Sequence, residues 1–229
     1  MSKITYSGDR PELLRFLDVR GRTVLDVGCG AGGLTPHLKR AGAERVVGVE
    51  LVDSQAAVAA EVCDAVIAAP IEQVLSDGLL GQERFGMVIL ADVLEHLVDP
   101  WTVLRTLTAD HLAPDGLMFV SVPNVANLDV IAQLARRGDW RYEKSGLFDR
   151  THLRWFGAGT LRSLLQQAGL EPVTWGGRLK IGVGRFSTTR LSDDVSRVPP
   201  FVIFQFHVLA RAATMVPETD AVPLRAAGF

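Results

Sequence analysis

The sequence has few cysteines and lacks the segments that mark membrane-spanning or secreted chains. Its 229 residues include only two cysteines, Cys29 and Cys63, whose spacing fits neither a disulfide scaffold nor a zinc site. No apolar run reaches the roughly 18 residues of a membrane span, and the opening MSKITYSGDR has no apolar signal-peptide core. We therefore expect a cytoplasmic protein that binds no membrane and no metal.

A surplus of charge of one sign is also missing. The formal net charge is −2, so the chain as a whole does not attract nucleic acid or anionic membranes. No internal repeat or low-complexity segment stands out, and 48% hydrophobic residues are typical of globular proteins. We expect one domain over residues 1–213, followed by a mobile tail at 214–229 that contains two prolines and many small residues.

The most informative feature that is present is a glycine-rich turn between two apolar runs. Residues 24–33 read VLDVGCGAGG, and Glu50 closes the run VVGVE. A strand, a glycine turn, a helix and a second strand ending in an acid make half of a nucleotide-binding βαβ unit. Gly28 and Gly30 let the backbone approach a ligand closely, and an acid at Glu50 can accept hydrogen bonds from ribose hydroxyls. The pattern predicts an adenosine-containing cofactor.

Asp26 indicates which adenosine cofactor is expected. Gly28, Gly30 and Gly33 also satisfy the dinucleotide pattern G-x-G-x-x-G. A carboxylate two residues before the first glycine would face the phosphates of a dinucleotide, whereas it suits a cofactor that carries a sulfonium and an ammonium group. Asp26 thus favours S-adenosylmethionine over NAD, although a strand-end residue that caps the turn would look the same.

Apolar runs alternate with helical stretches through the first half of the chain, which predicts a parallel sheet with right-handed crossovers. After residue 122 this alternation stops, and residues 187–198 are expected to form a polar loop. The predicted strands are 23–28, 45–50, 65–68, 86–91, 117–122, 170–177 and 201–212, and the predicted helices are 11–19, 33–41, 54–61, 71–77, 101–110 and 160–169.

Residues 20–125 resemble the class I, Rossmann-like S-adenosylmethionine-dependent methyltransferases. The resemblance is carried by LDVGCGAG, VVGVE, FGMVILADVLEHLVDPW and LMFVSVPN. It is greatest to the ubiquinone-methyltransferase-like group of small-molecule enzymes, and GLFDRTHLRWF at 146–156 also resembles a stretch of that group. The resemblance implies an α/β fold with a Rossmann-like seven-stranded, mostly parallel sheet, an antiparallel C-terminal strand pair, and a lid inserted after the fifth strand, at about 124–156.

The same resemblance implies where the cofactor binds. The methionine part is expected at Asp26 and the glycine turn, the ribose at Glu50, and the sulfonium beside the end of the fourth strand. Pro70 stands where the family often has an acid for adenine, so the backbone of Ile71 or the carboxylate of Glu72 is expected there instead. The expected cofactor residues are Asp26, Gly28, Gly30, Glu50, Leu51, Ile71, Leu90 and Asp92, with Tyr6 and Arg10 in a leading segment that covers the cofactor.

Methyl transfer needs a nucleophile aligned with the methyl–sulfur bond, and a hydroxyl acceptor also needs a base. Two of the five histidines are candidates. His152 lies in the lid, where Asp149 can orient its ring, and His96 follows the fourth strand on the methyl-donor side. Loop-holding roles for both histidines stay open.

The acceptor is expected beneath the lid. Asn124, Arg150 and Trp155 are the candidate contacts, and the basic and aromatic residues of 136–154 suit an anionic or sugar-bearing small molecule. A solvated segment with local ion pairs is the alternative. The sequence therefore predicts methyl transfer to a hydroxyl oxygen of a small molecule, in a protein that does not bind nucleic acid and that can form oligomers. N-methylation, RNA or protein methylation, and non-catalytic cofactor binding remain as alternatives.

Overall fold

A computed structural model describes residues 10–182, 185–190 and 199–213. Tyr6 and the expected tail at 214–229 lie outside these residues. Within them, no helix combines the length and the apolar character needed to cross a membrane. The strands are β1 (Thr23–Val27), β2 (Arg45–Glu50), β3 (Ala65–Ala68), β4 (Phe85–Ala91), β5 (Leu112–Pro123), β6 (Leu170–Gly182), β7 (Arg185–Arg190) and β8 (Ile203–Ala212). The helices are α1 (Thr35–Arg40), α2 (Asp53–Ala59), α3 (Ile71–Ser76), α4 (Pro100–Thr106), α5 (Leu128–Arg137) and α6 (Ala158–Gln167), with short helical turns at η1 (Pro11–Arg15), η2 (Leu94–His96), η3 (Leu107–His111) and η5 (Pro200–Val202).

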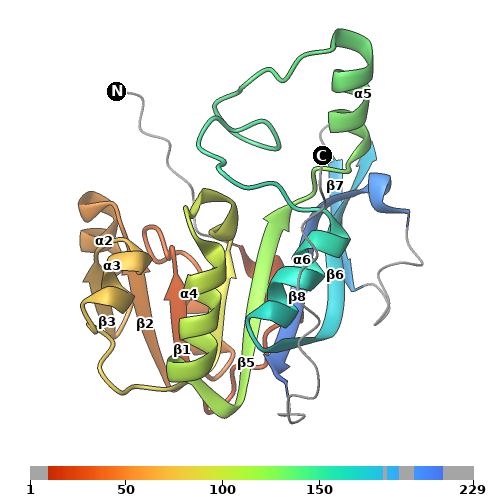
Figure 1. The fold of residues 1–229 in the computed structure, drawn as a ribbon. Helices are drawn as coiled ribbons and strands as arrows, with labels where there is room; N and C mark the ends of the chain where they lie inside the picture. The colour runs from red at the N-terminus through yellow and green to blue at the C-terminus, as the bar shows by residue number, and fades with distance from the viewer. Residues whose placement is uncertain (1–9, 183–184, 191–198, 214–229) are drawn as a thin grey trace, which may run out of the picture.

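The strands form one sheet in the order β3-β2-β1-β4-β5-β8-β6-β7 (Figure 1). Strands β1 to β5 run parallel to one another, whereas β8 runs antiparallel to both β5 and β6. The mostly parallel Rossmann-like sheet and the antiparallel β6–β8 pair are therefore confirmed. Strand order reverses between β1 and β4, which is where ligands bind in open α/β sheets.

The number of strands was predicted wrongly, because the sheet has eight strands rather than seven. The additional strand, β7, pairs antiparallel with β6 and overlaps the stretch that was expected to be a polar loop. Ser187, Thr188 and Thr189 give β7 a polar sequence, but an edge strand exposes its side chains and tolerates such residues. Polarity alone therefore did not distinguish this strand from a loop.

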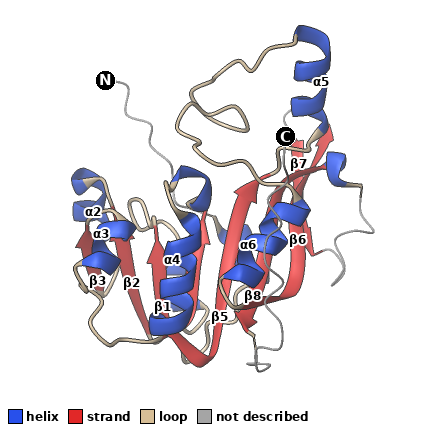
Figure 2. Cartoon of the chain, in the orientation of Figure 1, coloured by secondary structure: helices blue, strands red, loops and turns tan. Residues whose placement is uncertain are grey.

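Helical elements pack on both faces of the sheet, and α3, α4 and α6 lie over the face turned to the viewer in Figure 2. The larger apolar cluster joins the sheet to α3, α4 and α6 through residues such as Val74, Leu104 and Leu164. The smaller cluster joins the other face to α1 and to the N-terminal segment through Leu13, Phe16 and Leu38. Because the central strands are buried on both faces, they read as continuous apolar runs in the sequence. The leading helix expected at 11–19 is instead the short 3₁₀ turn η1.

The insertion after β5 spans residues 124–157 and rises beyond the carboxyl ends of the strands (Figure 1). It begins with α5, whose N-cap Asn127 accepts a hydrogen bond from the Asp129 N–H and which ends at Gly138, a residue with φ +61°. The long loop that follows returns to the sheet edge at η2, where the N–H groups of Leu153 and Arg154 donate to the Glu95 carbonyl oxygen. The insertion predicted after the fifth strand is therefore present, and we call it the lid, although its covering of an acceptor stays a prediction.

Candidate functional site

Two neighbouring cavities open at the carboxyl ends of the strands. The larger cavity, about 650 Å³, lies over β1, β2 and β4, and its lining includes the glycine turn. The smaller cavity, about 380 Å³, lies between η2, the lid and β8. Arg10, Asp92 and His96 line both cavities, so a ligand in one would lie next to a ligand in the other.

The glycine turn closes one side of the larger cavity. Gly28 has φ +70°, and a Cβ at this position would lie 2.9 Å from a methyl carbon of Val93, so another residue would be both strained and crowded. A hydrogen bond joins the part of the turn at Gly30 to β2, because the Gly30 N–H donates to Glu50 Oε2 at 2.9 Å. The Val52 N–H donates to the other carboxylate oxygen, Oε1, at 2.9 Å. Glu50 is thus fixed at the cavity edge, with lone pairs left for a ligand hydroxyl.

Asp26 lies at the floor of the larger cavity and is 3% exposed. Burial, together with the nearby Cys63 and Glu50, raises the pKa of its carboxyl to about 7. A cationic ligand group would reverse this cost, because an opposite charge favours the ionised carboxylate. The electrostatics of this position therefore suit a cation rather than a phosphate.

Most residues that the sequence predicts for the cofactor come together in this cavity. Its lining includes Arg10, Asp26, Gly28, Gly30, Glu50, Leu51, Ile71 and Asp92. Pro70 and Glu72 also line it, so the stretch expected to meet adenine is in place. Leu90 is the exception among the described residues: its side chain is fully buried in the core and does not line the cavity. Gln55 and Thr151 line the cavity without having been predicted.

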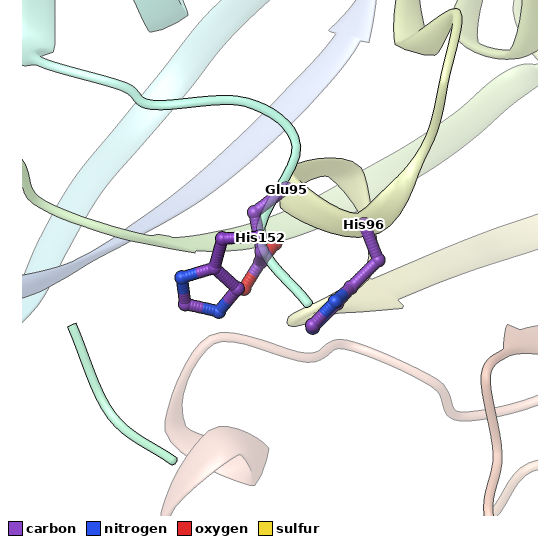
Figure 3. A group of neighbouring side chains, drawn as sticks. All are labelled: Glu95, His96 and His152. Atoms are coloured by element: carbon purple, nitrogen blue, oxygen red, sulfur yellow. The ribbon is translucent and has the colours of Figure 1, made fainter. Parts of the chain in front are cut away.

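Glu95, His96 and His152 form a compact cluster on the border of the smaller cavity. Each offers one ligand atom, and these atoms lie within 4.8 Å of one another. Figure 3 shows the three side chains pointing toward one another, two from η2 and one from the lid. The two imidazole rings meet edge to face at a centroid distance of 4.9 Å. The structure thus brings together the two histidines that the sequence proposed separately.

The protonation of this cluster follows from its burial. Burial raises the pKa of the Glu95 carboxyl well above its usual range, and the Asp92 charge adds to this effect. Burial also lowers the pKa of His152, as does the neighbouring His96, whereas the Asp149 charge acts in the opposite direction. His152 is therefore a neutral imidazole at neutral pH and is able to accept a proton.

The cluster also has the donor set of a divalent cation site, although the sequence predicted no metal. One ring nitrogen of His96, Nδ1, lies 3.2 Å from the Thr151 carbonyl oxygen and donates to it. Metal-binding histidines commonly donate one nitrogen in this way, which leaves the other for the ion. Glu95 Oε2 is buried and has no hydrogen-bond partner among the described residues. These residues fit a cation, which would give that oxygen a partner.

Asp149, the predicted orienting partner of His152, is 1% exposed. Its Oδ1 accepts hydrogen bonds from the N–H and the hydroxyl of Thr151, at 2.9 and 2.7 Å. These bonds stabilise the lid turn that carries His152. A contribution of Asp149 to catalysis stays a prediction.

The three predicted acceptor contacts lie outside the linings of both cavities. Asn124 is fully buried and its side chain is occupied by backbone groups. The side chain of Arg150 is exposed, and Trp155 is 45% exposed, with its ring 5.8 Å from that of Trp140. The contacts of Asn124 favour a structural role, whereas contacts of Arg150 and Trp155 with an acceptor stay predictions. The smaller cavity instead exposes Arg178, Phe204 and Gln205, which the sequence analysis did not identify.

Comparisons with known proteins agree with this geometry. A family model described as a methyltransferase domain matches residues 7–174. A ubiquinone biosynthesis O-methyltransferase from Ruegeria pomeroyi is 33% identical over 168 residues, which cover 67% of this chain and 61% of that relative. The aligned part thus spans less than two thirds of the relative.

Solved structures show the same fold at low sequence identity. A methyltransferase from Thermotoga maritima, described as a possible histamine N-methyltransferase, has a TM-score of 0.63 and 16% identity, covering 91% of this chain and 88% of the other. A 1,6-didemethyltoxoflavin-N1-methyltransferase from Burkholderia thailandensis, solved with its acceptor and S-adenosylhomocysteine, has a TM-score of 0.58 and 21% identity, covering 91% of this chain and 79% of the other.

Proposed function

The chain belongs to the class I, S-adenosylmethionine-dependent methyltransferases, and from this premise we propose that it methylates a hydroxyl oxygen of a small molecule. The observation that carries the proposal is the pair of adjoining cavities. The larger one suits the methyl donor, and the smaller one suits an acceptor beside Glu95, His96 and His152. The O-methyltransferase relatives support oxygen as the acceptor atom.

The cofactor's charges match the larger cavity. Its α-ammonium group pairs with Asp26, whose buried carboxyl otherwise favours the neutral acid. Glu50 accepts hydrogen bonds from the ribose hydroxyls, and Pro70, Ile71 and Glu72 line the wall for adenine. Arg10 offers its guanidinium to the cofactor carboxylate. The sulfonium then lies near Asp92, on the border of the smaller cavity.

The protein's chemical task is alignment and removal of one proton. Alignment of a nucleophile with the methyl–sulfur bond can contribute about 7–11 kcal/mol, and a general base about 10²–10⁴-fold in rate. His152 is neutral at working pH and lies beside the acceptor space, so it accepts the proton of the hydroxyl. His96 is held by the Thr151 carbonyl and completes the wall.

As an alternative to His152 acting as the base, we propose that Glu95, His96 and His152 bind a divalent cation, in which case His152 is a ligand and does not accept the proton. The Glu95 oxygen without a partner among the described residues, the closeness of the three ligand atoms, and His96 with one nitrogen already donating favour this role. A bound cation lowers the pKa of a hydroxyl that it coordinates. The protonated carboxyl of Glu95 must lose its proton to bind the ion, so cation binding strengthens as the pH rises.

The test uses purified protein with labelled S-adenosylmethionine and separate pools of hydroxylated metabolites, amines, RNA and protein. We expect methyl transfer only to hydroxylated small molecules, with the product identified by mass spectrometry. Transfer to amines would favour N-methylation, and transfer to RNA or protein would overturn the small-molecule assignment. Cofactor binding without any transfer would favour a non-catalytic role.

A parallel series tests the cation. The protein is treated with a chelator and then supplied with Mg²⁺, Mn²⁺, Co²⁺ or Zn²⁺. We expect the chelator to stop turnover, one of these ions to restore it, and Glu95→Gln to weaken binding of that ion in calorimetry. Unchanged turnover after metal removal would leave His152 as the direct base and reject the cation.

A further inference from the structure

Asp92 has an unusual backbone conformation at the border of the two cavities. It is the single non-glycine residue with a positive φ, +60°, among the residues that the structure describes. Such a conformation is sparsely populated, and it persists only where the surroundings hold it in place. The Asp92 N–H contacts both the carbonyl oxygen and the hydroxyl of Ser121, at 3.1 and 3.2 Å.

The side chain of Asp92 is held as firmly as its backbone. Its Oδ2 accepts from Arg10 Nη1 at 2.5 Å, and its Oδ1 accepts from the Ser121 hydroxyl at 2.9 Å and from Gln205 Nε2. Arg10 Nη2 in turn donates to Gln205 Oε1 at 3.2 Å. Gln205 therefore bridges both members of the Arg10–Asp92 ion pair.

This bridge fixes the orientation of the Gln205 amide. A guanidinium can only donate and an ionised carboxylate can only accept, so Oε1 must face Arg10 and Nε2 must face Asp92. His207 Nε2 lies 3.3 Å from the same Oε1. Because Oε1 can only accept, His207 must carry its hydrogen on Nε2 and donate it.

His207 is built to hold this one tautomer. It is fully buried in β8, and its ring lies edge to face with Phe16 at 5.3 Å and tilted to Phe119 at 5.8 Å. Its Nδ1 is buried and has no hydrogen-bond partner among the described residues. Burial, with the positive charge of Arg10, lowers its pKa to about 3, so the ring stays neutral.

We infer that His207 and Gln205 are positioning residues that hold the Arg10–Asp92 pair where the methionine end of the cofactor binds. The inference rests on the proposed function. The chain of donors runs from His207 to Gln205, and from Gln205 and Arg10 to Asp92. Neither β8 residue contacts the reacting atoms in this scheme. They act by holding the Arg10 guanidinium in one orientation at the border of the two cavities. Its remaining N–H groups can then donate to the carboxylate of the cofactor.

The test compares two ligands that differ only at the methionine end. S-adenosylhomocysteine carries the amino-acid part, whereas methylthioadenosine lacks it. Calorimetry on the full chain measures both dissociation constants. We expect Gln205→Leu to weaken S-adenosylhomocysteine binding about tenfold, as for a lost hydrogen bond to a charged group, and methylthioadenosine binding less than about twofold.

Two variants test His207: one removes its N–H donor, and the other replaces that donor with a different one. His207→Phe keeps an aromatic ring against Phe16 and Phe119 but has no donor, and we expect about fivefold weaker S-adenosylhomocysteine binding. His207→Gln restores an N–H donor and should recover most of the affinity. His111→Phe is the matched control, because His111 is also buried but bonds to the Glu83 carbonyl away from both cavities.

The outcomes separate the inference from the function on which it rests. Wild-type protein that binds neither ligand would overturn both. Wild-type protein that binds S-adenosylhomocysteine, with both variants unchanged, would overturn the positioning role alone. Equal weakening of the two ligands would also overturn it, since this would indicate general loss of structure, and thermal unfolding of each variant would reveal such a loss.

Discussion

The two cavities differ in how the chain builds them. The larger cavity takes most of its lining from short stretches that follow four successive strands, at 26–30, 49–52, 69–72 and 91–93. The smaller cavity gathers single residues from distant parts of the chain, from Arg10 through His152 to Gln205. The fold thus forms the larger cavity, the proposed cofactor site, from local sequence, whereas the smaller cavity, the proposed acceptor site, depends on long-range packing.

The largest expected effect tests the local, cofactor side of this comparison. Asp26→Ala removes a buried charge that pairs with the cofactor cation, and we expect S-adenosylmethionine to bind about 1,000-fold more weakly, within the cost of breaking a buried charge pair. Calorimetry measures the change. Asp53→Asn is the control, because Asp53 lies at the start of α2, near the cavity, but outside its lining. Retained affinity in Asp26→Ala would reject the assignment of the cavity.

The second effect tests the acceptor side. His152→Asn removes the proposed proton acceptor, and we expect turnover to fall about 100-fold, the lower range for a general base. Cofactor affinity should change less than about twofold, because His152 lines only the smaller cavity. Steady-state rates with the identified acceptor, together with calorimetry, check both parts. A matching loss of cofactor affinity would show that the two cavities do not act separately.

The third effect concerns a residue that the sequence assigned to the acceptor. Asn124 Nδ2 donates to the carbonyl oxygens of Pro200 and Ile203 at 2.7 and 2.8 Å, and Oδ1 accepts from the Ala126 N–H at 3.0 Å. Asn124→Ala would leave these buried groups unpaired, so we expect a loss of about 2 kcal/mol in unfolding free energy. The melting temperature should fall by about 4–8 °C in a chain of this size.

Activity distinguishes the two roles of Asn124. A structural role predicts an acceptor KM within about twofold of wild type at a temperature where the variant is folded. A tenfold rise in acceptor KM with an unchanged melting temperature would restore the acceptor role and contradict the structural one.

The same difference between a cavity built from local stretches and one built from distant residues explains what the sequence could predict. The central strands were predictable because burial on both faces demands apolar runs, and Asp26 and Glu50 were predictable because they are the acids near the carboxyl ends of those runs, in β1 and β2. Arg10 and Gln205 are 195 residues apart and hydrogen-bonded, and no local pattern reveals such a contact. Strand β7 was missed because edge strands do not require apolar residues.

The cluster of Glu95, His96 and His152 lies between these extremes. His96 and His152 were both identified, but as alternatives, because nothing in the sequence says that the lid returns to η2. Glu95 was passed over although it precedes His96 directly. The signal was the acid itself: a carboxylate beside a histidine at a strand end is a common feature of sites that move protons or bind metals.

The smallest expected effect returns to the larger cavity and uses pH in place of mutation. Burial holds the pKa of Asp26 near 7 in the free protein, and a bound cation favours the ionised carboxylate and so lowers that pKa. The free protein therefore carries more protons than the complex below pH 7, and binding must release one. Affinity for S-adenosylmethionine should then fall as the pH falls, by up to about tenfold per unit below 7, and level off above it. Calorimetry between pH 5.5 and 8 in buffers of different ionisation enthalpy would detect both the change in affinity and the released proton. An affinity independent of pH, with no proton released, would mean that Asp26 does not meet the cofactor's positive charge.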